Sequence, residues 1–158
     1  NPAMVEWQTA ARLEFQVQNL PDAARKAATA PRITRPHLAA LLVTLVPEVA
    51  SARVPPGADV ATDVLDRAES GALVKAIALG FFSVSKETHL VGADVPVSRS
   101  EMPGHLRRLS GLLSRRDDAC FAAPAALATC GILPEATSRQ VSGREAFAAI
   151  EATLRLAR

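Results

Sequence analysis

The chain is poor in the residues that favour β-strands. Its 158 residues include no tyrosine and one tryptophan, and aromatic residues make up only 4% of the sequence. Alanine, the strongest helix former, is instead the commonest residue. This balance argues against a strand-rich fold and predicts a mostly α-helical protein.

The sequence also lacks a long apolar run. Its longest, residues 38–46, is far shorter than the ~20 residues that a membrane-spanning helix needs, so we expect no transmembrane segment in this chain. Two cysteines are too few for a disulfide framework or a four-cysteine zinc site. No initial methionine and no targeting segment are seen, so we expect a mature or excised piece of a longer protein.

No pattern typical of an enzyme is present. His37, His89 and His105 are far apart and do not have the spacing of metal ligands. Nucleophile elbows, phosphate loops and dinucleotide fingerprints are also missing. We therefore expect a non-catalytic protein that holds no metal and no cofactor.

The charge of the chain is nearly balanced. The 18 lysines and arginines exceed the 16 acidic residues by two, which predicts no nucleic-acid partner by itself. Arginines at positions 107, 108, 115 and 116 form a local basic cluster. This cluster could bind DNA phosphates, polymer acids or an acidic partner, although a solvated helix face is the favoured interpretation. The absence of interleaved aromatic residues argues against a single-stranded nucleic acid.

Proline and glycine divide the chain into predicted helices. These span residues 4–18, 23–30, 34–46, 70–82, 98–113, 120–130 and 142–156. We expect an irregular connection over residues 50–66 and loops over residues 83–97 and 132–140.

Two features of these helices leave alternatives open. Cys120 and Cys130 would lie roughly 15 Å apart on one continuous helix, so two buried free thiols are favoured. A disulfide is the alternative if Pro124 redirects the chain. Trp7, Phe15, Leu13 and Val17 are expected to pack in the core, with an exposed contact patch as the alternative.

A short motif recurs at three predicted helix starts. Its copies are Ile33-Thr-Arg-Pro-His-Leu38, Val97-Ser-Arg-Ser-Glu-Met102 and Val141-Ser-Gly-Arg-Glu-Ala146. Each begins with a β-branched residue, continues with Ser or Thr, and then has an arginine-containing pair. Ser98 with Glu101, and Ser142 with Glu145, fit the capping box of a helix N-terminus. Arginine is electrostatically unfavourable there, so its recurrence suggests a site for acidic groups. Pairing with a nearby carboxylate is the simpler interpretation of the residues alone.

A second element precedes two of the copies. A predicted helix ends in glycine and two apolar residues at Gly80-Phe-Phe82, and again at Gly131-Ile-Leu133. The repeating unit is therefore a helix, a glycine stop, a loop and a capped helix.

These residues resemble the S-layer homology (SLH) repeat, in which a helix ending in glycine and two apolar residues precedes a Thr-Arg-Ala-Glu-type helix start. The matching segments are Thr34-Arg35-Pro36-His37, Ser98-Arg99-Ser100-Glu101 and Ser142-Gly143-Arg144-Glu145. The first segment has His37 in place of the glutamate, and the third has Gly143 in place of the arginine, with Arg144 displaced by one position. The first thirty residues also resemble a tetratricopeptide helix pair, through Ala10-Ala11, Asn19-Leu20-Pro21-Asp22-Ala23 and Ala27.

The SLH resemblance implies three helix-loop-helix repeats in a pseudo-threefold bundle, over residues 1–54, 55–116 and 117–158. It implies a protein of the bacterial cell envelope, periplasmic or at the cell surface, that anchors a larger protein to an acidic wall polymer or a peptidoglycan-associated glycan. The implied ligand-binding residues are Arg35, Arg99 and Arg144, with Thr34, Ser98 and Ser142 beside them. Because every motif is incomplete, the alternative is a helical scaffold that binds protein partners in an envelope assembly.

Overall fold

A computed structural model describes residues 1–56, 61–64, 70–113 and 119–158. The prediction of a mostly helical fold is confirmed. The α-helices of the described residues are α1 (Pro2–Gln18), α2 (Asp22–Thr29), α3 (Arg35–Leu45), α4 (Pro47–Ala50), α5 (Ser70–Ala78), α6 (Met102–Leu112), α7 (Pro124–Thr129) and α8 (Gly143–Ala157). Two 3-10 turns, η1 (Thr62–Val64) and η2 (Ala119–Phe121), complete the regular structure, and only isolated β-bridges occur in these ranges.

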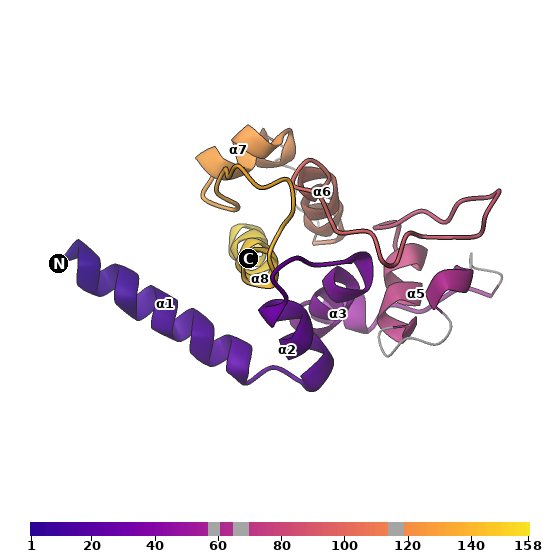
Figure 1. Ribbon diagram of the computed structural model, residues 1–158, viewed down its shortest axis with the longest axis horizontal. Coiled ribbons are helices and arrows are strands. Elements are labelled where there is room, and N and C mark those ends of the chain that lie inside the picture. Colours follow the sequence, from indigo (N-terminus) through magenta and orange to yellow (C-terminus); the bar gives the residue numbers. More distant parts are fainter. Residues whose placement is uncertain (57–60, 65–69, 114–118) are drawn as a thin grey trace.

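Helices α3 and α8 lie at the centre of the body. Helix α3 packs against α2, α5 and α8, and α8 packs in addition against α2 and α6. The sequence of α3 explains its position, because Leu38, Leu41 and Leu42 leave it apolar on most of its surface and all three are buried. Helix α1 projects from this body and contacts it near its C-terminal end (Figure 1).

Helices α5 and α7 end in the same local structure. Gly80 and Gly131 both have a positive φ, of 87° and 73°. The residue after each glycine, Phe81 or Ile132, donates its N–H to the carbonyl five positions earlier in the helix. This is the Schellman arrangement, which favours glycine at its left-handed position. The apolar pairs that follow both glycines are buried, as the sequence pattern predicts.

The helix expected from residue 98 begins four residues later, at Met102. Pro103 has no N–H to donate to the carbonyl of Arg99, so the preceding residues cannot continue the α-helical hydrogen-bond pattern. They form a separate turn, in which Glu101 N donates to Ser98 O and Met102 N donates to Arg99 O. The helix expected over residues 70–82 is also shorter, because it stops before Gly80.

The prediction of two buried free thiols is wrong, since Cys120 and Cys130 form a disulfide with their Cα atoms 5.8 Å apart. The segment is not one helix. Residues 119–121 form η2, and a new helix begins at Pro124 and carries Cys130 back towards Cys120. Pro124 therefore redirects the chain, which is the alternative that the sequence left open.

The prediction that four residues of α1 pack in the core is wrong for Trp7 and Phe15. Their exposed fractions are 67% and 71%. The prediction is confirmed for Val17, which is buried, and for half-buried Leu13, and these two form the face of α1 that meets the body. The bulkiest side chains of α1 therefore belong to its solvent-facing side.

Candidate functional site

The chain segments that enter the three motif helices meet one another, and we call this meeting point the junction. Ile33 N donates to Val141 O at 2.9 Å, and Val97 N donates to Ile33 O at 2.8 Å. Isolated antiparallel bridges join residue 34 to residue 96, and residue 98 to residue 140. Each segment thus pairs with both of the others. The motif valines and isoleucine at 33, 97 and 141 are fully buried there.

Thr34, Ser98 and Ser142 directly follow these buried residues, and each backbone N–H is bound by the side chain three residues later. Ser98 N donates to Glu101 at 2.8 Å, and Ser142 N donates to Glu145 at 3.1 Å. In the first motif His37 takes the role of the glutamate, because its Nδ1 accepts the N–H of Thr34 at 3.2 Å. Replacement of glutamate by histidine therefore preserves the local hydrogen bond.

Arg35 and Arg99 each bind a carboxylate of the next motif. Arg35 lies 3.7 Å from Glu101, and Arg99 forms a hydrogen-bonded ion pair with Glu145. Burial raises the pKa of Glu145, but the hydrogen bonds from Arg99 and from the Ser142 backbone outweigh it and leave the pKa below its usual value. The pairing with a carboxylate that the residues alone suggested is thus present at both positions.

Arg35 also holds the turn over residues 91–93. Its Nη1 donates to Val91 O, and its guanidinium lies 5.9 Å from the ring centroid of Phe82. A Cβ on Gly92 would lie 3.0 Å from this guanidinium, so the glycine leaves room for it. Asp63 fixes the same turn by accepting the N–H groups of residues 91, 92 and 93 at 2.8–3.1 Å.

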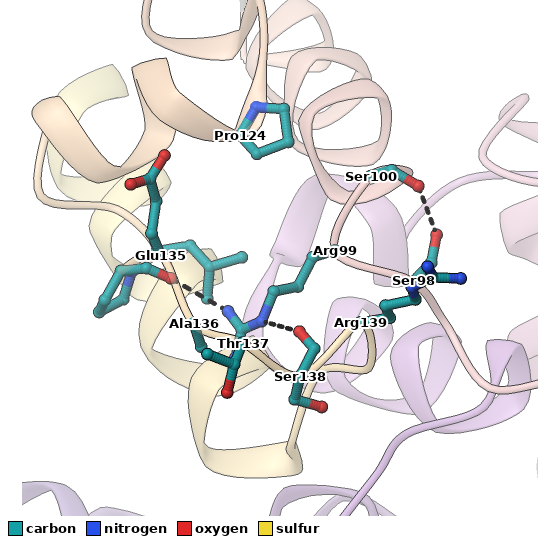
Figure 2. A pocket seen from close by; sticks show the side chains of 11 residues that line it. Ser98, Arg99, Ser100, Pro124, Glu135, Ala136, Thr137, Ser138 and Arg139 are labelled. Atoms are coloured by element: carbon teal, nitrogen blue, oxygen red, sulfur yellow. Dashed lines mark hydrogen bonds between the residues drawn. The ribbon is translucent and has the colours of Figure 1, made fainter.

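Arg99 holds a second loop and forms one wall of a cleft. Its Nε donates to Ser138 O at 2.9 Å and its Nη1 donates to Pro134 O at 3.0 Å, while Nη2 binds Glu145. Figure 2 shows the side chain reaching from the 98–101 turn across to the 134–138 segment. The Arg99 side chain is only 12% exposed. Its position is therefore fixed by the chain itself.

The cleft beside Arg99 has a volume of about 580 Å³. This lies within the ~300–1,000 Å³ typical of small-molecule sites. Its walls combine hydroxyl groups, proline and leucine side chains, and three charged residues. The lining residues are Ser98, Arg99, Ser100, Pro124, Leu133, Pro134, Glu135, Ala136, Thr137, Ser138 and Arg139 (Figure 2).

Arg139 is a cleft residue that the sequence analysis missed. Its backbone carbonyl accepts the N–H of Arg99 at 2.7 Å, so it lies directly opposite the second motif. The side chain is exposed, and in the described part of the chain it has no ion-pair partner. It precedes the third motif by two residues and belongs to no motif of its own. Only the backbone pairing across the junction brings it to the cleft.

The third motif departs from the other two because Gly143 is tightly enclosed. A Cβ at this position would lie 2.6 Å from both the carbonyl carbon and the oxygen of Ala28, and closer still to Ala27 O. Arginine therefore cannot occupy position 143. Arg144 points elsewhere and binds Glu14 of α1 through two hydrogen bonds, at 2.7 and 2.8 Å. These bonds, together with one from Gln18, lower the pKa of Glu14 to about 2.

The implied ligand residues are thus divided between different surroundings. Ser98 and Arg99 line the cleft. Thr34 and Arg35 lie at the contact with the 91–93 turn, and Ser142 and Arg144 lie near α1 and α2. The structure brings all three helix starts together at the junction but does not bring the three guanidinium groups to a common ligand site.

The histidines and the basic cluster have local roles. His105 Nε2 lies 2.8 Å from Glu101, and its ring packs edge-on against Phe82. Within the described ranges, no group of three or more histidine, cysteine or acidic residues is arranged to hold a metal ion. Arg108 Nε donates to Leu79 O at 2.7 Å. Arg115 and Arg116, the other half of the predicted basic cluster, lie outside the described residues.

No helix of the described ranges is both long enough and apolar enough to cross a membrane. Comparison of the chain with protein-family models, with curated protein sequences and with solved structures finds no match.

Proposed function

We propose that this chain is a non-catalytic binding domain of the bacterial cell envelope, which anchors a larger protein to an acidic wall or surface polymer. The observation that carries the proposal is the cleft beside Arg99, at the contact between the second and third motifs. Its walls have the three kinds of group that bind a charged sugar, and Arg139 supplies a guanidinium there that binds no carboxylate within the described residues.

The chemistry of the cleft fits an acidic saccharide. The rings of Pro124 and Pro134 offer apolar surface to the C–H face of a sugar. The hydroxyls of Ser100 and Thr137 can exchange hydrogen bonds with sugar hydroxyls. A carboxylate or phosphate on the sugar would bind Arg139, because a guanidinium presents two parallel donors to such groups.

Two further features support an envelope protein with an SLH-like architecture. The disulfide between Cys120 and Cys130 is typical of proteins that fold in an oxidising compartment such as the periplasm or the cell exterior. The three helix starts also pair with one another at the junction, which is the relation expected of three copies of one unit.

The direct test is sedimentation of the purified protein with wall material that retains its acidic polymer. We expect the intact domain to bind, and Arg139→Ala to lower the affinity at least about tenfold, as for the loss of a charged contact. Arg12→Ala is the matched control, because it removes the same charge from exposed α1, away from the cleft. Arg99→Ala is less informative, since it also releases the 134–138 segment.

Two results would contradict the proposal. Absence of binding by the intact domain removes the anchoring function. Equal binding by the intact domain and Arg139→Ala removes the cleft as its site.

The alternative function is a scaffold that binds envelope proteins. It is favoured by one observation, namely that Arg35, Arg99 and Arg144 all bind carboxylates within the chain. Such arginines stabilise the fold whether or not a sugar binds. Co-purification with protein partners that resists high salt, without binding to wall polymer, would support this function over the first.

A further inference from the structure

Helix α1 carries an apolar stripe that the fold leaves uncovered. Successive residues of a helix are turned by about 100°, so Met4, Trp7, Ala11 and Phe15 fall within a stripe roughly 80° wide. Their exposure is high, at 53% for Met4, 67% for Trp7 and 71% for Phe15, and Ala11 is also exposed. Two large aromatic side chains on one exposed helix face are typical of a contact surface.

The body of the protein does not use this stripe. Leu13 and Val17, the side chains of α1 that pack on the core, are centred roughly 140° away from it around the helix. The Glu14–Arg144 ion pair holds the C-terminal half of α1 against α8. Figure 1 shows the rest of the helix extending away from the body. A second helix can therefore lie along the stripe without displacing any described contact.

The stripe is complementary to itself when two copies run antiparallel. With the two-fold axis beside residue 9, Trp7 of one copy faces the small Ala11 of the other, and Met4 lies within one residue of the level of Phe15. Large residues then lie against small or flexible ones, which allows close packing of two helices. The same contacts occur twice, as a two-fold interface requires.

The charges of α1 indicate that the partner of the stripe is a protein and not a lipid membrane. Its charged residues are Glu6, Arg12 and Glu14, none of which belongs to the stripe. Helices that lie on membranes instead carry a polar face rich in lysine and arginine. We propose that the stripe formed by Met4, Trp7, Ala11 and Phe15 binds a second copy of this chain as an antiparallel helix pair.

The area of the stripe predicts weak association. A fully enclosed aromatic side chain buries ~150–250 Å², so the exposed parts of the four aromatic side chains in a pair supply roughly 400–700 Å². Stable complexes bury at least ~1,200 Å². We therefore expect a weak and reversible dimer. A dimer of this kind would present two clefts and raise the avidity for a polymer.

The test uses the single tryptophan of the chain as its reporter. Sedimentation equilibrium and Trp7 emission are followed from about 1 μM to about 1 mM. We expect the mass to rise towards that of a dimer and the emission to shift to shorter wavelength over the same range. Phe15→Glu should raise the dissociation constant at least about tenfold.

The matched control is Val5→Glu. Val5 is also exposed, at 60%, but lies roughly 120° from the centre of the stripe. We expect it to change the dissociation constant less than about twofold. Circular dichroism of both variants should match that of the native chain, because neither side chain is buried.

Cysteine cross-linking tests the direction of the pair, with the native disulfide left intact. Under mild oxidation, Met4→Cys mixed with Phe15→Cys should form the mixed dimer. Met4→Cys alone should not, because the two copies of residue 4 would lie about 16 Å apart.

Four outcomes would overturn the inference. The first is a monomer at 1 mM whose Trp7 emission is unshifted, and the second is an equal rise in the dissociation constant for Val5→Glu and Phe15→Glu. The third is cross-linking of Met4→Cys to itself. The fourth is a shift of the Trp7 emission on addition of lipid vesicles, without self-association of the protein.

Discussion

Replacement of Gly143 by alanine should destabilise the protein strongly, although alanine is the better helix former. The added Cβ would lie 2.6 Å from the backbone of Ala28, where ordinary van der Waals contacts begin at 3.4 Å. The contacting atoms belong to the backbone at the end of α2, so they cannot move aside as a flexible side chain can. The N–H of Gly143 also donates to Ala30 O at 2.8 Å, and separation of α8 from α2 would lengthen this bond.

The expected cost follows from these two contacts. Overpacking costs about 1–3 kcal/mol and a weakened hydrogen bond about 1 kcal/mol, while the higher helix propensity of alanine returns about 0.5–1 kcal/mol. The net loss in the free energy of unfolding is about 1–3.5 kcal/mol, or roughly 2–14 °C in the melting temperature for a chain of this size. Urea unfolding followed by circular dichroism measures it.

Gly111→Ala is the matched control for this experiment. Gly111 lies in α6, and among the described residues no side chain and no other segment of the chain comes within 4 Å of the place where its Cβ would be. The same substitution there should stabilise the protein by about 0.5–1 kcal/mol. If Gly143→Ala proves as harmless as Gly111→Ala, the close approach of α8 to α2 is wrong, and so is the explanation of the displaced Arg144.

Three other predictions test separate parts of the fold. Reduction of the Cys120–Cys130 disulfide should lower the free energy of unfolding by about 3 kcal/mol, as expected for a loop of this length. Urea titrations with and without dithiothreitol measure this change. Equal free energies of unfolding in the two titrations would contradict the prediction. Ser110→Ala should stabilise the chain by about 1 kcal/mol, because the buried Ser110 hydroxyl has no hydrogen-bond partner among the described residues. Thermal melts measure this change, and a lower melting temperature of the variant would contradict it. The lowered pKa of Glu145 contributes stability that is present above the usual glutamate pKa of 4.5 and is lost as the pH falls through the folded-state value. In Glu145→Gln the melting temperature should therefore fall less steeply as the pH is lowered below about 4.5. An equally steep fall in the variant and the native chain would contradict this role of Glu145.

Local signals in the sequence predicted much of the secondary structure. Gly80 and Gly131 end their helices because only glycine readily adopts the left-handed conformation there, and this requirement is visible in the sequence. Ser142 and Glu145 form the predicted capping box at the start of α8. Errors arose where a proline changed the hydrogen-bond pattern, as Pro103 does before α6 and Pro124 does between the cysteines.

The cleft was much harder to predict. Ser98 and Arg99 belong to a recognisable motif, but Arg139 lies in a loop without periodicity or a motif. It reaches the cleft only because its backbone pairs with Arg99, forty positions away. The exposure of Trp7 was equally difficult to predict from the sequence, because an apolar stripe on one helix has the same pattern whether its partner is the core or another chain. The position of Arg139 and the exposure of Trp7 both depend on contacts between segments that are distant in the sequence.

The junction has a consequence for the order of events in biosynthesis. Ile33 emerges from the ribosome long before Val141, yet its N–H finds its acceptor only on that residue. The first helices of the body therefore cannot reach their final arrangement before the segment that contains Val141 has been synthesised. The junction therefore closes only after α8 has joined the helices that were made before it.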